Sequence, residues 1–214
     1  SMRAGSALGC LDDLSKGAPM GPSPNDAPAA RIDAANPAGT DGFEFVEFAH
    51  PEPQVLESLF QRMGYVEVAR HKSRDISLYR QGDINYVLNR EPGTHAARFV
   101  GEHGPCAPAM AWRVVDAHHT LARALAHGAV EYTGSDKTLD APAIYGIGGS
   151  LLYFVENYGA KGSPYARDFV WTGEADPKPK GVGFYYPDHL TQNVKRGNMD
   201  TWFRFYADIF NFRE

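Results

Sequence analysis

The stretch FEFVEFAHPEPQVLESLFQRMGY, residues Phe43–Tyr65, decides the fold of this chain, because its pattern returns twice. It consists of an apolar strand, a polar break, an amphipathic helix and a turn residue that precedes the next strand. The same order recurs in MAWRVVDAHHTLARALAHGAV, residues Met110–Val130, and begins again in DHLTQNVKRGNMDTWFRFYADIFNF, residues Asp188–Phe212. An internal repeat constrains the fold more strongly than any local propensity does.

The two complete copies each predict the order β-α-β-β-β. In the first copy, Gly64 stands where the helix should stop. Apolar residues then alternate on either side of Gly82-Asp83, which is typical of a hairpin. In the second copy Gly128 ends the helix, and Gly148-Gly149 is the expected hairpin turn. The sequence therefore predicts an α+β fold with two complete βαβββ units and the start of a third.

Changes in composition along the chain suggest four parts. Residues 1–40 are rich in Ala, Gly, Pro and Ser and are expected to form a disordered leader. Residues 41–157 hold both complete units and form the predicted first domain. Residues 158–182, rich in Pro, Gly and charge, are interpreted as a linker with one short strand at Phe169–Trp171 at best. Residues 183–214 are expected to be the truncated start of a second, catalytic domain.

The overall composition excludes several classes of partner. The net charge is -5, so no basic surface for nucleic acid is expected. The charges are interspersed and no apolar stretch approaches the length of a membrane helix, so no membrane contact is expected. With only Cys10 and Cys106 there is no disulfide framework, which favours a reducing cytoplasm.

His189 is the strongest candidate metal ligand. If Asp188–Val194 is a strand, His189, Thr191 and Asn193 share one polar face, which can turn towards a cavity. Asp188 would point to the opposite face and would not be the hydrogen-bond partner of His189. The alternative is a structural histidine, held by hydrogen bonds at the start of a strand.

The other histidines offer no such site. The positions that correspond to His189 in the complete units fall near Glu44–Phe45 and Ala109–Ala111, and neither contains a histidine. Adjacent helical residues point about 100° apart, so His118-His119 are interpreted as a solvated helix face rather than a chelating pair. His103 is placed in a loop without a partner at metal-ligand spacing.

Several motifs, in order and with plausible spacing, carry a more specific resemblance from about Asn36 to the end. The chain resembles the bacterial 4-hydroxyphenylpyruvate dioxygenase family, within the glyoxalase-like vicinal oxygen chelate superfamily. The motifs are GFEFVEFA (Gly42–Ala49), SLYRQGDINYVLN (Ser77–Asn89), EHGP (Glu102–Pro105), AIYGIGG (Ala143–Gly149), DHLTQNV (Asp188–Val194) and WFRFYADIFNFRE (Trp202–Glu214).

The resemblance implies that paired units form a half-barrel around a cavity, with helices on the outer face. It implies an N-terminal domain without metal and a C-terminal domain that binds one Fe(II) through two histidines and one glutamate. The first of these ligands corresponds to His189, and Thr191 is expected to reach the substrate pocket. The other two ligands come later in the family's chain, and this sequence has no positions for them.

The implied reaction converts 4-hydroxyphenylpyruvate and O2 to homogentisate and CO2 in the breakdown of tyrosine and phenylalanine, within a homo-oligomer. The 214-residue chain alone is expected to bind Fe(II) weakly and to be inactive. Three other interpretations stay open. They are a hydroxymandelate synthase, a metal-free module that holds a small ligand between its two units, and a structural domain that makes oligomer contacts.

Overall fold

The structure is a computed structural model of the chain, and it describes residues 29–173 and 176–213. Most of the predicted leader, residues 1–28, therefore lies outside the described residues. Residues just before the first unit are part of the packed structure. The Asn36 side chain donates to the carbonyl of Thr40 at 2.9 Å, and Ala38 is fully buried. None of the helices in the described ranges is both long enough and apolar enough to span a membrane.

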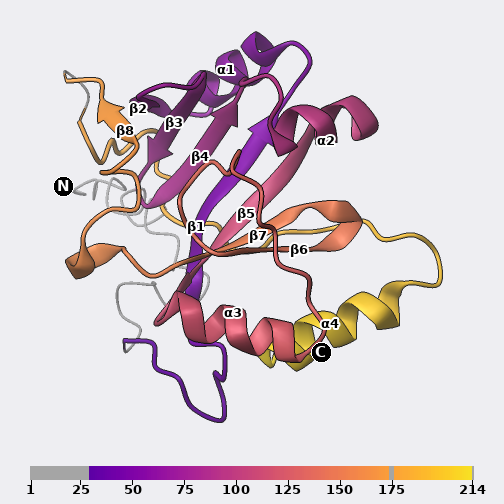
Figure 1. Cartoon of the computed structure of the whole chain (residues 1–214). Helices are drawn as coiled ribbons and strands as arrows, with labels where there is room; N and C mark the ends of the chain where they lie inside the picture. The colour runs from indigo at the N-terminus through magenta and orange to yellow at the C-terminus, as the bar shows by residue number, and fades with distance from the viewer. Residues whose placement is uncertain (1–28, 174–175, 214) are drawn as a thin grey trace, which may run out of the picture.

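In the described part of the chain, one mixed sheet has the strand order β6-β7-β5-β1-β4-β3-β2-β8 (Figure 1). The strands are β1 (Thr40–Ala49), β2 (Val66–His71), β3 (Ile76–Gln81), β4 (Ile84–Asn89), β5 (Cys106–Val114), β6 (Ala143–Tyr145), β7 (Leu151–Val155) and β8 (Phe169–Trp171). The α-helices are α1 (Pro53–Arg62), α2 (His95–His103), α3 (Ala117–Ala126) and α4 (Met199–Phe210). Short 3-10 turns occupy Ile147–Gly149 and Gly159–Lys161.

The strand pairing confirms the two repeated units. In the first unit β1 pairs in parallel with β4, and β3 pairs antiparallel with both β4 and β2. In the second unit β5 pairs in parallel with β7, and β6 pairs antiparallel with β7. The opening strands β1 and β5 pair antiparallel and join the two units at the centre of the sheet. Each unit thus presents the same order of strands outward from this central seam.

Helices cover one face of the sheet. Phe60 of α1 packs with Tyr65, Tyr79 and other apolar residues of the first unit. On the second unit, α3 and α4 lie side by side (Figure 1), and Arg123 of α3 donates to the carbonyl of Ile209 at 2.6 Å. Phe210 of α4 is buried against the same cluster as α3. In α1, α3 and α4 the apolar stripe of the helix is therefore buried, as the amphipathic pattern predicts.

The opposite face of the sheet is covered by loops rather than helices. Phe45 and Tyr153 from the central strands pack there with Tyr165 and Phe169. The last two come from the segment interpreted as a linker, whose short strand β8 pairs antiparallel with β2. This segment consequently closes one edge of the sheet and completes the second hydrophobic core.

Three local expectations were wrong. The order β-α-β-β-β predicts a strand directly after the helix of the second copy, but in that part of the structure only Glu131 makes an isolated bridge to Ile144. The helix α2 was not expected; Thr94 caps it by accepting a hydrogen bond from the amide of Ala97 at 3.2 Å. His103 therefore lies at the end of a helix and not in a loop.

The third repeat matches its prediction only in part. The helix after the break is present as α4, and it ends at Asn211, whose φ of 58° is left-handed. The preceding Asp188–Val194 forms no strand, because no described strand lies beside it to supply backbone partners. The alternation of side chains that was expected from a strand does not apply to this segment.

Candidate functional site

His189 and Thr191 line two neighbouring hollows between the sheet and the segment that leads to α4. His189 borders a hollow of about 440 Å³ together with Tyr65 and Tyr86. Thr191 borders another of about 620 Å³, which also contains His103. Val46 of β1 lines both hollows. The two predicted residues are therefore close in the fold, but they face different spaces.

The geometry expected around His189 was wrong in one respect. Its Nδ1 lies 2.8 Å from a carboxylate oxygen of Asp188, the residue that was expected to point away. Without a strand, adjacent side chains are free to converge. The imidazole is 73% exposed. Thus His189 is accessible to a metal, and Asp188 fixes which ring nitrogen stays available.

The described residues do not fit an iron centre by themselves. An Fe(II) dioxygenase of this kind needs three protein ligands on one face of the metal. Among residues 29–173 and 176–213, no three His, Cys, Asp or Glu side chains come close enough together to hold a metal ion. The identification of His189 as one ligand of a larger set stays a prediction.

Two further histidines and Cys106 have structural surroundings. His119 lies 2.9 Å from the carbonyl of Pro37, and the His103 ring packs 4.3 Å from that of Phe99. Burial and the nearby Glu47 carboxylate raise the pKa of the Cys106 thiol to about 11. A thiol with so high a pKa is a poor nucleophile at neutral pH.

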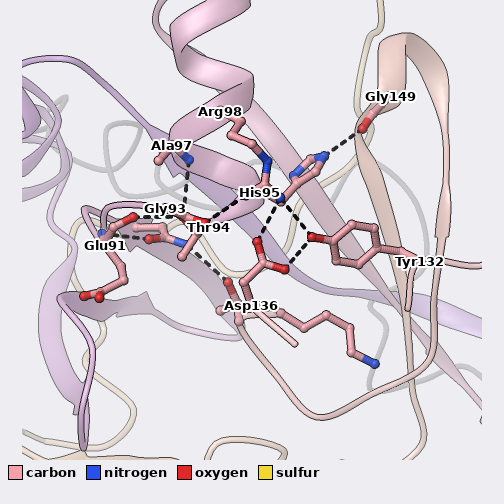
Figure 2. A network of polar contacts seen from close by, with 12 residues as sticks. Glu91, Gly93, Thr94, His95, Ala97, Arg98, Tyr132, Asp136 and Gly149 are labelled. Atoms are coloured by element: carbon pink, nitrogen blue, oxygen red, sulfur yellow. Dashed lines mark hydrogen bonds and ion pairs between the residues drawn. The ribbon is translucent and has the colours of Figure 1, made fainter. Parts of the chain in front are cut away.

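A polar network ties α2 to the second unit (Figure 2). Arg98 donates to Asp136 at 2.9 Å, and Tyr132 donates to the same carboxylate. Burial alone would raise the pKa of Asp136, but these two hydrogen bonds hold it below its usual value. His95 at the start of α2 lies 2.9 Å from the carbonyl of Gly149. Because every group faces another protein group, the network is a clamp between elements rather than a binding site.

Sequence reasoning missed two buried carboxylates on the loop-covered face. Glu47 accepts hydrogen bonds from Asn89 at 2.7 Å and Thr138 at 2.8 Å, and burial raises its pKa. Glu44 accepts from Arg113 Nε at 2.6 Å, and its side chain is 2% exposed. Burial also raises the pKa of Glu44, although Arg113 opposes this. The available signal was the pair of glutamates in the otherwise apolar strand FEFVEF.

Glu44 and Arg113 lie at one end of a cavity of about 480 Å³, which we call the Arg80 cavity. Asn85 connects Glu44 with Arg80. The amide of Asn85 donates to the carbonyl of Glu44 at 2.8 Å, and its side-chain oxygen accepts from Arg80 Nε at 2.7 Å. The walls combine β1, β3, β4 and β5 with the segment after β7. The lining residues used below are Glu44, Arg80, Arg113, Tyr158, Tyr165 and Trp171.

Comparison with known proteins identifies the family of the chain. Residues 34–170 match the family described as "Hydroxyphenylpyruvate dioxygenase, HPPD, N-terminal". The chain is 51% identical to "Hemolysin VllY" of Vibrio vulnificus over 190 residues, covering 86% of this chain and 53% of that protein. It is 47% identical to the 4-hydroxyphenylpyruvate dioxygenase of Pseudomonas aeruginosa over 191 residues, again covering 86% and 53%.

A solved structure agrees with this result. The "xylose isomerase-like TIM barrel/4-hydroxyphenylpyruvate dioxygenase fusion protein" superposes with a TM-score of 0.73 at 34% identity. The match covers 87% of this chain and 28% of that one. The chain spans about half the length of the curated relatives it matches. The paired βαβββ units are a vicinal oxygen chelate fold, and the chain belongs to the hydroxyphenylpyruvate dioxygenase N-terminal family.

Proposed function

We propose that this chain is the N-terminal part of a 4-hydroxyphenylpyruvate dioxygenase that converts 4-hydroxyphenylpyruvate and O2 to homogentisate and CO2. The observation that carries the proposal is the 47% identity to the Pseudomonas aeruginosa enzyme over 86% of this chain. The pathway would be tyrosine and phenylalanine breakdown, and the setting a cytoplasmic homo-oligomer. In this proposal residues 41–157 form the metal-free domain, 158–182 connect the domains, and 183–214 open the catalytic domain.

His189 would supply one of three ligands to Fe(II), and Thr191 would line the substrate pocket. Fe(II), if held by His189 together with two further ligands, would supply the oxidation chemistry for the keto acid and O2. Within this chain, the contribution of His189 is an exposed imidazole, and that of Asp188 is to hold one of its two nitrogens. The chain alone, with one such ligand, is expected to bind Fe(II) weakly and to turn over no substrate.

A chimera tests the proposal directly. Residues 34–214 would be joined to the C-terminal half of the Pseudomonas aeruginosa enzyme, supplied with Fe(II), and assayed for homogentisate and O2 consumption. Restored turnover is expected, and His189→Ala should abolish both turnover and stoichiometric iron binding. His118→Ala, on the exposed face of α3, is the matched control and should change neither. A folded chimera that contains His189→Ala and still forms homogentisate would exclude the assigned ligand.

The products of the same chimera separate the alternatives. Hydroxymandelate in place of homogentisate would identify a side-chain oxidation. A second candidate role is a metal-free binding module, which is supported by the cavity of about 480 Å³ among the described residues. A chimera that folds and binds iron but forms neither product would support that module.

A further inference from the structure

The charges that line the Arg80 cavity do not balance. Arg80, Arg113 and Lys178 are basic, whereas only Glu44 and Asp83 are acidic. Arg113 pairs with Glu44 at 2.6 Å, and Lys178 pairs with Asp83 at 3.2 Å. Within the described residues, no carboxylate lies at ion-pair distance from Arg80. The cavity therefore holds one positive charge that no carboxylate of the described residues neutralises.

The hydrogen bonds of Arg80 hold its guanidinium in place without using all of its donors. Its Nε donates to Asn85 and its Nη1 donates to the carbonyl of Pro177, both at 2.7 Å. The Nη2 donors have no partner in the described part of the chain. A guanidinium presents its donors as a planar fork that matches a carboxylate. Because Arg80 is fixed at two points, it would lose little freedom on binding such a group.

Aromatic rings surround this guanidinium. The Arg80 carbon Cζ lies 5.2 Å from the centre of the Trp171 ring and 5.8 Å from that of Tyr165. Across the cavity, Arg113 lies 5.5 Å from the Tyr158 ring. Trp171 is 40% exposed, so part of this residue remains accessible to a ligand. Flat walls next to a cation favour a flat ring that carries an acid group.

Tyr165 adds a polar group to the cavity wall. The residue is 1% exposed, and its hydroxyl makes no hydrogen bond of full geometry among the described residues. It lies close enough to Glu44 for the two side chains to interact, and Arg80 and Arg113 are also near. A buried hydroxyl whose bonding capacity is incompletely used can accept or donate to a ligand oxygen.

We propose that the Arg80 cavity binds a small aromatic carboxylate, with its acid group on Arg80 and its ring against Trp171 and Tyr158. The volume of about 480 Å³ lies in the usual range for small-molecule sites. A monoanion fits better than a phosphate, because only Arg80 is left unneutralised. The site combines the two-unit domain with the segment 158–182, and its lining residues do not include His189.

Titration of the 214-residue chain with benzoate, followed by two-dimensional NMR of labelled protein, tests the site. Shifts are expected at the Trp171 indole and the Arg80 Nε group, with a dissociation constant on the order of 1 mM for so small a ligand. Benzamide has the same shape without the charge and should bind at least tenfold more weakly. Acetate and inorganic phosphate, which lack the ring, should also bind more weakly than benzoate.

Variants complete the test. Arg80→Gln should weaken benzoate binding at least tenfold, and Arg80→Lys should lie between it and the unmodified chain because it keeps the charge but loses the fork. Arg70→Gln is the control, since Arg70 is 69% exposed and outside the cavity. The proposal is overturned if benzamide equals benzoate, or if a folded Arg80→Gln variant binds normally. Shifts confined to residues outside the cavity lining would overturn it too, and this result needs no variant.

Discussion

Removal of Arg113 should destabilise the fold in a way that depends on pH. In the Arg113→Met variant, the Glu44 carboxylate loses its cation while its side chain remains 2% exposed. Breaking a buried ion pair in this way costs about 3–5 kcal/mol. Protonation of Glu44 costs less free energy than leaving its buried carboxylate charged. At pH 7 this costs about 3 kcal/mol, because a carboxyl with the ordinary pKa of 4.5 is ionised in the unfolded chain.

The direction in which the stability of the variant changes with pH follows from proton linkage. Burial raises the pKa of Glu44 above its unfolded value, so the folded variant binds more protons and its stability falls as pH rises above about 4.5. Relative to the unmodified chain, in which Arg113 opposes the rise in the pKa of Glu44, we therefore expect a loss of at most about 3 kcal/mol at pH 7 and less than about 1 kcal/mol at pH 5. Urea unfolding followed by circular dichroism measures both values.

Replacement of Glu44, the other partner of this ion pair, should destabilise the fold less than replacement of Arg113. Glu44→Gln leaves Arg113 without a charge partner, but the Arg113 side chain is 25% exposed and borders the open cavity. Its loss should be about 1 kcal/mol at pH 5 and smaller at pH 7, because the substitution also removes a carboxyl whose raised pKa costs more stability as pH rises. The double variant should resemble Glu44→Gln. Equal losses for both single variants, or a loss in Arg113→Met that is the same at pH 5 and pH 7, would refute the reasoning.

Four further substitutions test other parts of the structure by urea unfolding. Glu47→Gln keeps an acceptor oxygen and removes a carboxyl whose pKa is raised by burial. The free energy of unfolding should therefore increase by about 1 kcal/mol at pH 8 but not at pH 4. A decrease at pH 8 would contradict this prediction. Tyr165→Phe removes a buried hydroxyl that makes no hydrogen bond of full geometry, so it should change the free energy of unfolding by less than about 1 kcal/mol. A larger loss would mean that the contact of this hydroxyl with Glu44 is a full hydrogen bond. Asp136→Asn should lower the free energy of unfolding by at most about 1 kcal/mol above pH 4. This loss should vanish as pH falls through the lowered pKa of Asp136. A loss that stays constant down to pH 2 would argue against the network. Phe60→Ala should cost about 3–5 kcal/mol, since Phe60 is 2% exposed, and a cost below 1 kcal/mol would show that α1 is not anchored there.

The order of elements was predictable because it rests on local patterns. Alternation around Gly82-Asp83 and the stops at Gly64 and Gly128 each depend on a few adjacent residues. Gly64 illustrates the physical reason: its φ is 85°, and a Cβ there would lie 2.8 Å from the backbone nitrogen of Val182. A residue other than glycine would therefore meet both backbone strain and a clash.

The errors have local causes as well. In α2 the apolar stripe is short and the cap residue Thr94 was not recognised, although a threonine before a helical run is a start signal. The alternation at Asp188–Val194 resembled a strand, but a strand exists only where a neighbour supplies hydrogen bonds, and periodicity does not report neighbours.

The Arg80 cavity could not be predicted from the sequence for a different reason. Glu44 and Arg113 are separated by 69 positions, and they meet only because β1 and β5 pair antiparallel. Phe43 lies opposite Trp112 and Phe45 opposite Ala111, so Glu44 is an extra residue at an irregularity of β1, and from there its side chain reaches Arg113. Composition and spacing contain no information about such a register.

The antiparallel contact between β1 and β5 has a consequence for the origin of this architecture. Two identical half-length chains that paired through their first strands would form the same central ladder, because antiparallel pairing is compatible with a two-fold axis. A symmetric dimer of a single-unit ancestor, fused end to end after duplication of its gene, would leave such a ladder behind. Once the halves were on one polypeptide they were free to diverge, which accounts for a full second strand in one half and a single bridging residue in the other.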